Sequence, residues 1–155
     1  MSTAVSPESE SRRGGGQIGR RAARRRAVEL LYEAAQRELD PAAVLKEHAG
    51  SPDVDIVGDY TFTVVEGMSA NQERVDELLA EHAQGWTLER MPPVDLAILR
   101  VGVYEMLWSA DVPDAVAIDE AVGLAKDLST DDSPRFVNGV LGRIGNIADR
   151  LRAVL

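Results

Sequence analysis

Hydrophobic residues recur along this chain at intervals of three and four positions, which is the spacing of an amphipathic α-helix. The pattern is clearest after Pro113, where one apolar stripe comprises Ile118, Ala121, Val122, Ala125 and Leu128. The small, polar and acidic run 129–133, followed by Pro134, predicts the end of that helix, a turn and the start of another. The stripe of this last helix comprises Val137, Val140, Leu141, Ile144, Ala148 and Leu151, and we expect the tail 149–155 to continue it.

The same periodicity predicts five helices earlier in the chain. They are expected over Ile18–Leu39, over Pro41–His48, from Pro52 through Tyr60, Val64 and Met68, over Asn71–Gln84, and over Val94–Trp108. The pattern therefore predicts an all-α fold of about seven helices, in two packed helical subdomains over about 17–84 and 85–155. Residues 1–16 are rich in serine, glutamate and glycine, so we expect a disordered leader there.

The helix over Val94–Trp108 is apolar on nearly every side, which predicts that it is central and buried. A charge inside such a helix needs a partner, because an isolated buried charge is costly. We therefore expect Arg100 to pair with Glu105 or Glu120 in a structural role. Asp95 lies at the helix start, where it is either a cap or part of an acidic partner surface.

The last helix carries two unusual features. Gly139 and Gly142 lie inside its pattern, and a glycine there costs up to about 1 kcal/mol relative to alanine. We expect another helix to approach closely at these glycines in compensation. Phe136 lies at the edge of the apolar face beside the acidic turn, so it is either an edge-of-core filler or an exposed anchor. Periodicity alone favours the filler.

Charge is unevenly distributed along the chain, whose formal net charge is −9. Residues 1–26 hold seven arginines against two glutamates, a balance of +5, and the remaining ten basic and twenty-four acidic residues give −14. A basic arm on an acidic body suggests a polyanionic partner for the arm and a basic partner for the body. The alternative for the body is an acidic surface that only keeps the protein soluble.

Five arginines crowd the first two turns of the first helix: Arg20, Arg21, Arg24, Arg25 and Arg26. Positive charge at a helix N-terminus opposes the macrodipole, so local stability does not account for these residues and a ligand does. Arginine binds phosphate bidentately and stacks on bases, and Tyr32 lies two turns after Arg25 on the same side. We predict nucleic-acid binding here, the alternative being a solvated basic face with Tyr32 in the core.

Several other chemistries find no support in the sequence. The chain has no cysteine, and His48 and His82 stand alone without the spacing of metal ligands. No nucleotide-binding loop or catalytic triad is present, so we expect neither an enzyme nor a cofactor. No apolar run is long enough to span a bilayer and the N-terminus lacks the apolar core of a signal peptide, which predicts a cytoplasmic protein without membrane contact.

The C-terminal part of the chain resembles a known family. The resemblance is carried by Asp119-Glu120-Ala121-Val122, Leu124-Ala125-Lys126, Asp132-Ser133 and above all Phe136-Val137-Asn138-Gly139-Val140-Leu141. Leu99-Arg100-Val101, Tyr104-Glu105 and Asp111-Val112-Pro113 extend it upstream. These runs are similar to the signature of the NusB family of bacterial transcription antitermination factors, over about residues 20–144.

This resemblance implies a function. NusB proteins are all-helical and bind the boxA element of ribosomal RNA leader transcripts together with the ribosomal protein NusE. The pair helps to load an antitermination complex onto RNA polymerase, and some relatives form homodimers that hide the RNA surface. Carried over to this chain, the resemblance assigns Arg20, Arg21, Arg24, Arg25 and Tyr32 to RNA, and Asp95, Asp132 and Phe136 to the protein partner. It thus favours Phe136 as an exposed anchor.

Two alternatives remain open at this point. A NusB-like module also forms the front end of an RNA cytosine methyltransferase, but this chain stops before any cofactor-binding βαβ pattern. The other alternative is a purely structural helical bundle with an incidental basic arm. Salt-dependent RNA binding separates the bundle from an RNA-binding adaptor, because phosphate contacts weaken steeply as salt rises.

Overall fold

The computed structural model describes residues 18–50 and 58–155, and within these ranges the chain is all helical with no strand. The elements are α2 (Ile18–Arg37), α3 (Pro41–Gly50), α4 (Asp59–Ala70), α5 (Gln72–His82), the 3₁₀ turn η1 (Leu88–Arg90), α6 (Pro93–Trp108), α7 (Asp114–Leu128), α8 (Ser133–Gly145) and α9 (Ala148–Val154). The all-α prediction is confirmed. The predicted leader 1–16 and the predicted helix start near Pro52 lie outside the described residues.

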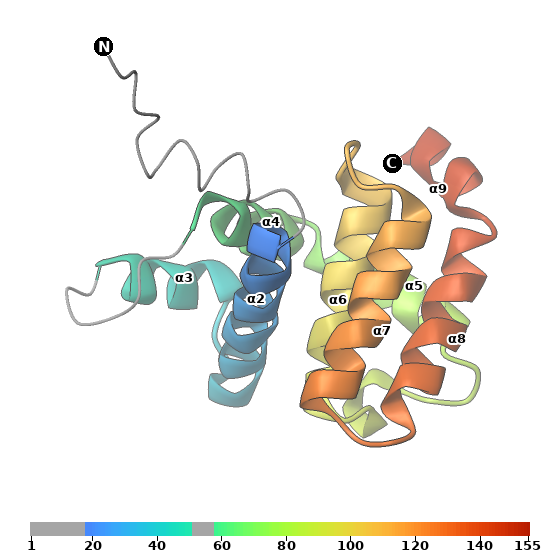
Figure 1. Cartoon of the computed structure of the whole chain (residues 1–155), viewed down its shortest axis with the longest axis horizontal. Helices are drawn as coiled ribbons and strands as arrows, with labels where there is room; N and C mark the ends of the chain where they lie inside the picture. Colours follow the sequence, from blue (N-terminus) through green and yellow to red (C-terminus); the bar gives the residue numbers. More distant parts are fainter. Residues whose placement is uncertain (1–17, 51–57) are drawn as a thin grey trace, which may run out of the picture.

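Helix α6 is the centre of the molecule, as its apolar sequence predicted. Figure 1 shows α2, α3 and α4 gathered on one side, with α6, α7 and α8 running side by side on the other. Helix α6 contacts α2, α4, α5, α7, α8 and α9, and the buried residues form one continuous core. Helix α5 packs on α6 and α8 as well as on α4, so a division into two subdomains near Gly85 stays a prediction. No helix within 18–50 or 58–155 is both long and apolar enough to cross a membrane.

The prediction that the last helix continues into the tail 149–155 is wrong. Helix α8 ends at Gly145, and a separate helix, α9, begins at Ala148. Ile147 takes φ −120° and ψ 12°, which is not helical, and this turn redirects α9 toward α6 and the start of α7. There Arg152 donates to the carbonyl oxygen of Met106 at 2.9 Å and pairs with Asp114 at 2.9 Å. These contacts favour the redirected path over a straight continuation.

The expected close approach at Gly139 and Gly142 is also wrong. A Cβ at Gly142 would meet nothing within 4 Å, and one at Gly139 would meet only Arg143 of its own helix, at 3.4 Å. The close approaches occur instead at Gly102 of α6, where a Cβ would lie 2.7 Å from Cδ1 of Leu141, and at Gly67 of α4. A Cβ at Gly67 would lie 2.5 Å from the ring of Tyr104. These two glycines let α8 and α4 pack tightly against α6.

The predicted partner of Arg100 is wrong as well. Its Nε and Nη2 donate to the two carboxylate oxygens of Asp76 in α5, at 2.9 and 3.0 Å. Glu105 lies five residues further along α6, which at 3.6 residues per turn is about 140° around the helix. It therefore faces α2 and α4 rather than α5. The need for a partner was predicted correctly, but the identity of the partner depends on how the helices are rotated against one another.

Candidate nucleic-acid and protein interfaces

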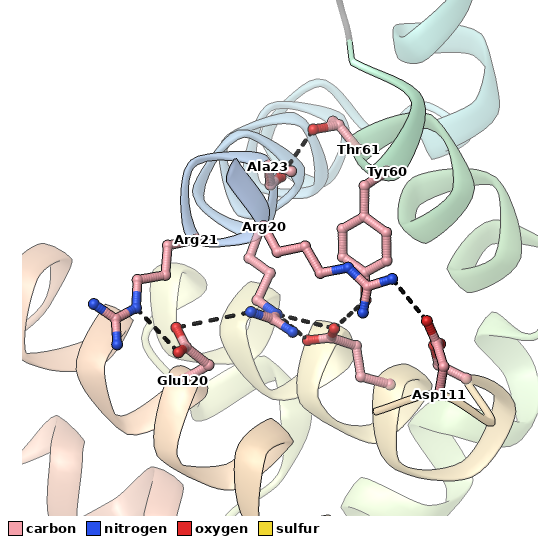
Figure 2. Close-up of polar contacts among 10 residues, drawn as sticks. Arg20, Arg21, Ala23, Tyr60, Thr61, Asp111 and Glu120 are labelled. Atoms are coloured by element: carbon pink, nitrogen blue, oxygen red, sulfur yellow. Dashed lines mark hydrogen bonds and ion pairs between the residues drawn. The ribbon is translucent and has the colours of Figure 1, made fainter. Parts of the chain in front are cut away.

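The basic strip comprises Arg20, Arg21, Arg24 and Arg25 on the first two turns of α2. Helix α2 starts beside α6 and α7, so three of the four arginines reach across to carboxylates of the second half of the chain. Figure 2 shows the side chain of Arg21 directed at Glu120. The side chain of Arg20 lies against Tyr60 and ends at Asp111. Thr61 fixes the position of α2 by donating its hydroxyl to the carbonyl oxygen of Ala23 at 2.9 Å.

The innermost contact of the basic strip is a buried ion pair. Nε of Arg24 donates to both carboxylate oxygens of Glu105, at 2.8 and 2.9 Å, and the two side chains are 4% and 1% exposed. Tyr60 donates its hydroxyl to the same carboxylate. Burial by itself lowers the pKa of Arg24, but the hydrogen bond and charge of Glu105 outweigh it and the pKa is raised. Burial is the largest cause that raises the pKa of Tyr60, and the hydrogen bond to Glu105 raises it further.

Arg20 is held from two directions. Its guanidinium lies 4.4 Å from the centroid of the Tyr60 ring, a cation–π geometry, and its Nη2 pairs with Oδ2 of Asp111 at 2.7 Å. The hydrogen bond from Arg20 lowers the pKa of Asp111. The Arg20 side chain is 32% exposed and the Asp111 side chain 64%, so this pair is in contact with solvent.

The two outer arginines differ in their partners. Nε of Arg21 donates to Glu120 at 3.1 Å, and the other carboxylate oxygen of Glu120 lies 3.8 Å from Nη1 of Arg24. Arg25 is exposed and forms no ion pair with any residue in the described ranges. A groove of about 520 Å³ runs between this part of α2 and α7, and Arg21, Arg25 and Lys126 line it together with acidic side chains. The arrangement offers exposed cations along one groove, which suits a phosphate backbone.

A second candidate surface lies at the far end of α7 and α8. The aromatic pocket is a hollow of about 440 Å³ whose lining residues are Trp86, Pro92, Asp95, Thr130, Asp132, Ser133, Arg135 and Phe136. Phe136 packs partly on the core and meets Trp86 edge to face, with ring centroids 5.9 Å apart and planes at 60°. Trp86 itself is 49% exposed. An exposed tryptophan in contact with a partly buried phenylalanine at the rim of a hollow is typical of a protein-binding surface.

Asp95 forms the base of the aromatic pocket. It is 2% exposed and accepts hydrogen bonds from the hydroxyls of Ser129, at 2.5 Å, and Ser133, at 2.9 Å. These bonds tie the start of α6 to the turn between α7 and α8. Asp95 therefore shapes the aromatic pocket from below rather than capping its own helix, while Asp132 is exposed at the rim.

Comparison with known proteins identifies the family. Residues 21–146 match the model of the NusB family. The chain belongs to the NusB family. A relative from Saccharopolyspora erythraea named transcription antitermination protein NusB is 64% identical over 137 residues, covering 88% of this chain and 93% of the relative. One of the same name from Beutenbergia cavernae is 54% identical over 142 residues, covering 86% and 93%.

Solved structures agree with this assignment. NusB of T. maritima has a TM-score of 0.73 at 31% identity, covering 88% of this chain and 97% of that one. A crystal structure of the antitermination factors NusB and NusE in complex with dsRNA has a TM-score of 0.71, with 84% and 98% covered. Its identity of 24% makes it a match of fold alone. The homologues are thus transcription antitermination factors and not named as enzymes.

The residues that the NusB resemblance assigned to RNA are differently placed in the structure. Arg20 and Arg21 reach solvent, Arg25 is exposed, and Arg24 is buried against Glu105. Tyr32, further along α2, is 39% exposed, so the alternative that placed it in the core is wrong. Lys126 was not singled out from the sequence as a site residue, because only the fold places this part of α7 across the groove from the arginines of α2.

The residues assigned to the protein partner come together around one hollow. Phe136 is partly a core filler and partly a rim residue, so it has features of both interpretations left open by the sequence. Trp86 was missed, because it lies in a connection without helical periodicity. The available signal in the sequence was an aromatic residue directly after Gly85, the glycine that follows the predicted helix over Asn71–Gln84.

The two histidines lie in local polar contacts. His48 lies between Arg26 and Glu33, with its Nδ1 3.1 Å from the first and its Nε2 2.8 Å from the second. His82 shares a hydrogen bond of 2.8 Å with the carbonyl oxygen of Leu78 in its own helix. Across residues 18–50 and 58–155, no group of three or more histidine or acidic side chains is placed to hold a metal ion.

Proposed function

We propose that this chain is a cytoplasmic, non-catalytic RNA-binding adaptor in transcription antitermination. It binds boxA RNA of ribosomal RNA leader transcripts together with the ribosomal protein NusE, and the pair joins the antitermination complex on RNA polymerase. The observation that carries the proposal is that one helical body presents two unlike surfaces, the basic strip and the aromatic pocket. Membership of a family of antitermination factors supports it.

The RNA side rests on the cations that remain in contact with solvent. Arg25 and Lys126 line the same groove as Arg21, so phosphates entering the groove meet three positive side chains from two helices. Arg20, stacked on Tyr60, extends the row toward Asp111. Arginine forks bind phosphate bidentately, and this contact needs no particular base. Arg24 supports the row from below through Glu105 and does not itself face RNA.

The partner side rests on shape and charge. The aromatic pocket offers the exposed Trp86, the rim residue Phe136 and the acidic Asp132. Residues 27–155 carry a net charge of −14 in the sequence, so a basic ribosomal protein is attracted to this body by complementary charge. An apolar side chain of such a partner can enter the hollow between the two rings, where burial of aromatic surface contributes most of the binding free energy.

The test is binding of fluorescently labelled boxA RNA, with and without NusE, to the wild type and to Phe136→Asp. We expect NusE to tighten RNA binding of the wild type, and the substitution to remove this gain while leaving binding of RNA alone unchanged. Phe62→Asp is the matched control, since Phe62 is also an exposed aromatic (40%) but lies on α4. RNA binding that is absent at moderate salt, or that NusE does not alter, contradicts the proposal.

A homodimer that covers the basic strip would oppose RNA binding. Sedimentation of the pure chain, with and without RNA, measures this competing association. If RNA dissociates a dimer, the two contacts use the same surface.

A further inference from the structure

Three of the four arginines of the basic strip are paired with carboxylates inside the molecule. Arg20, Arg21 and Arg24 face Asp111, Glu120 and Glu105 respectively, so three positive charges meet three negative ones. All three carboxylates come from the second half of the chain, on α6, on α7 and in the loop between them, and none comes from α2 itself. A carboxylate paired with each of these arginines weakens their attraction for RNA, so attraction alone does not account for the arrangement.

We propose that Asp111 and Glu120 compete with RNA phosphate for Arg20 and Arg21, and thereby set how strongly the basic strip binds RNA. The inference rests on the proposed RNA-binding function and deepens it. In the free protein the two carboxylates occupy the guanidinium donors, and a phosphate must displace them. An isolated anion then competes poorly, whereas a strand that offers several phosphates to Arg20, Arg21, Arg25 and Lys126 at once competes well.

The exposure of the pairs makes this exchange physically accessible. The Arg20–Asp111 pair is 32% and 64% exposed, and in the Arg21–Glu120 pair the arginine is 65% exposed while the glutamate is 15% exposed. Exposed ion pairs of this kind are weak, because solvent screens them and each long side chain loses rotamer freedom. The Arg24–Glu105 pair is 4% and 1% exposed, so we expect it to stay intact when RNA binds.

The exchange also leaves no charged side chain without a neighbour. When Arg21 turns to a phosphate, Glu120 retains Arg24, whose Nη1 lies 3.8 Å away. When Arg20 releases Asp111, its guanidinium remains over the ring of Tyr60, 4.4 Å from the centroid, and Asp111 is exposed to water. Each charged group therefore contacts an opposite charge, an aromatic ring or water, both in the free protein and when RNA is bound.

The experiment is to measure the affinity of labelled boxA RNA for the wild type, Asp111→Asn, Glu120→Gln and the double variant at one fixed salt concentration. Both substitutions preserve shape and remove only the negative charge. The matched control is Asp59→Asn, because Asp59 is exposed beside Tyr60 and forms no ion pair with another described residue. Urea unfolding of every variant verifies that the fold is kept.

We expect each single substitution to tighten RNA binding by about two- to five-fold, the range of an exposed ion pair, and the double variant to exceed either. Asp59→Asn is expected to change the affinity by less than about two-fold, the low end of an exposed charge contact. If the wild type binds RNA but Asp111→Asn and Glu120→Gln bind no more tightly than the control, the competition is refuted and the RNA-binding function stands. If none of the proteins binds RNA, both proposals fall. If Glu120→Gln is destabilised, the exposed Asp111→Asn decides alone.

Discussion

The basic strip and the aromatic pocket lie on the same helical body but are built in opposite ways. In the basic strip three of the four arginines already have partners: Arg20, Arg21 and Arg24 each contact a carboxylate. In the aromatic pocket the rim remains available, since Trp86 is 49% exposed and Phe136 is only partly buried. Of the charged residues that line the aromatic pocket, Asp95 is buried and holds the turn above it, while Asp132 and Arg135 are exposed.

The difference follows from the physics of the two kinds of contact. A charge left alone at a surface attracts every counter-charged molecule, so internal partners limit unspecific binding at a modest cost. An apolar rim gains specificity from shape, and it needs a rigid base rather than a competitor. The basic strip is thus controlled by exchange of partners, and the aromatic pocket by preorganisation. Four predictions test this contrast, from the largest expected effect to the smallest.

The largest effect is expected from Glu105→Ala, which leaves Arg24 buried without its partner. Removing one member of a buried ion pair costs about 3–5 kcal/mol, a large part of the 5–15 kcal/mol that stabilises a typical domain. Urea unfolding measures the loss. The double variant Arg24→Met with Glu105→Leu is expected to recover most of it, because paired apolar residues often replace a buried pair at little cost.

The control for this prediction is Glu47→Gln on α3, whose carboxylate pairs with the exposed Arg37. Its loss should change the urea midpoint little, because solvent screens surface pairs. Equal destabilisation by Glu105→Ala and Glu47→Gln would mean that the buried pair does not hold α2 to α6.

A smaller effect is expected from Trp86→Ala at the rim of the aromatic pocket. Truncating an aromatic anchor costs about 2 kcal/mol of binding, roughly a thirty-fold loss of affinity for NusE. Calorimetry with purified NusE measures it. Because Trp86 is 49% exposed, stability should change little. Phe62→Ala serves as the control, and an equal loss of NusE affinity there would remove Trp86 from the interface.

Salt should separate the two surfaces. If three of the four cations Arg20, Arg21, Arg25 and Lys126 each neutralise one phosphate of a single strand at a time, the logarithm of affinity falls with a slope of about −2 against the logarithm of salt. RNA binding then weakens about twenty-fold between 50 and 200 mM salt. Binding of NusE alone to the aromatic pocket should weaken much less, since its contribution is mainly apolar. Identical salt slopes in fluorescence titrations would contradict the contrast.

The smallest effect is expected from acid. The pKa of Asp111 is lowered by the hydrogen bond from Arg20, so this pair stabilises the fold above the unfolded carboxyl value of about 3.9 and is lost as pH falls through the lower folded value. The pair is exposed, so its contribution is below about 1 kcal/mol. The urea midpoints of wild type and Asp111→Asn should differ at pH 6 and converge toward pH 3. A difference that grows on acidification would reverse the sign and refute the assignment.

Periodicity was sufficient to predict the helices and the central position of α6, because helix burial is recorded in the spacing of apolar residues along one element. Most predicted start and end residues fall within a few residues of the observed ones, but α4 begins at Asp59, after the extended Gly58, and not at the predicted Pro52. The break after Gly145 was missed, since the apolar stripe continues through Ala148 and Leu151 across the turn. A turn that preserves the stripe leaves no signal in the periodicity.

Pairings between elements were not predictable in the same way. The sequence shows that Arg100 needs a carboxylate and offers several, but only the rotation of α5 against α6 selects Asp76. The close approaches at Gly67 and Gly102 depend likewise on which helices cross there. The residues assigned by family resemblance gather at two surfaces, yet the burial of Arg24 and Asp95 was not visible, because each is covered by elements distant in sequence.

The buried pair of Arg24 and Glu105 has a consequence for how sequences of this fold can change. Replacing Arg24 alone leaves Glu105 without a cation, and replacing Glu105 alone leaves Arg24 only the more distant Glu120, at 3.8 Å, whereas both replaced together leave an apolar contact. In a library randomised at both positions, selection for folded protein should therefore recover two clusters, one of oppositely charged pairs and one of apolar pairs, with few mixed sequences between them. The two positions are therefore expected to change together, although 81 residues separate them along the chain.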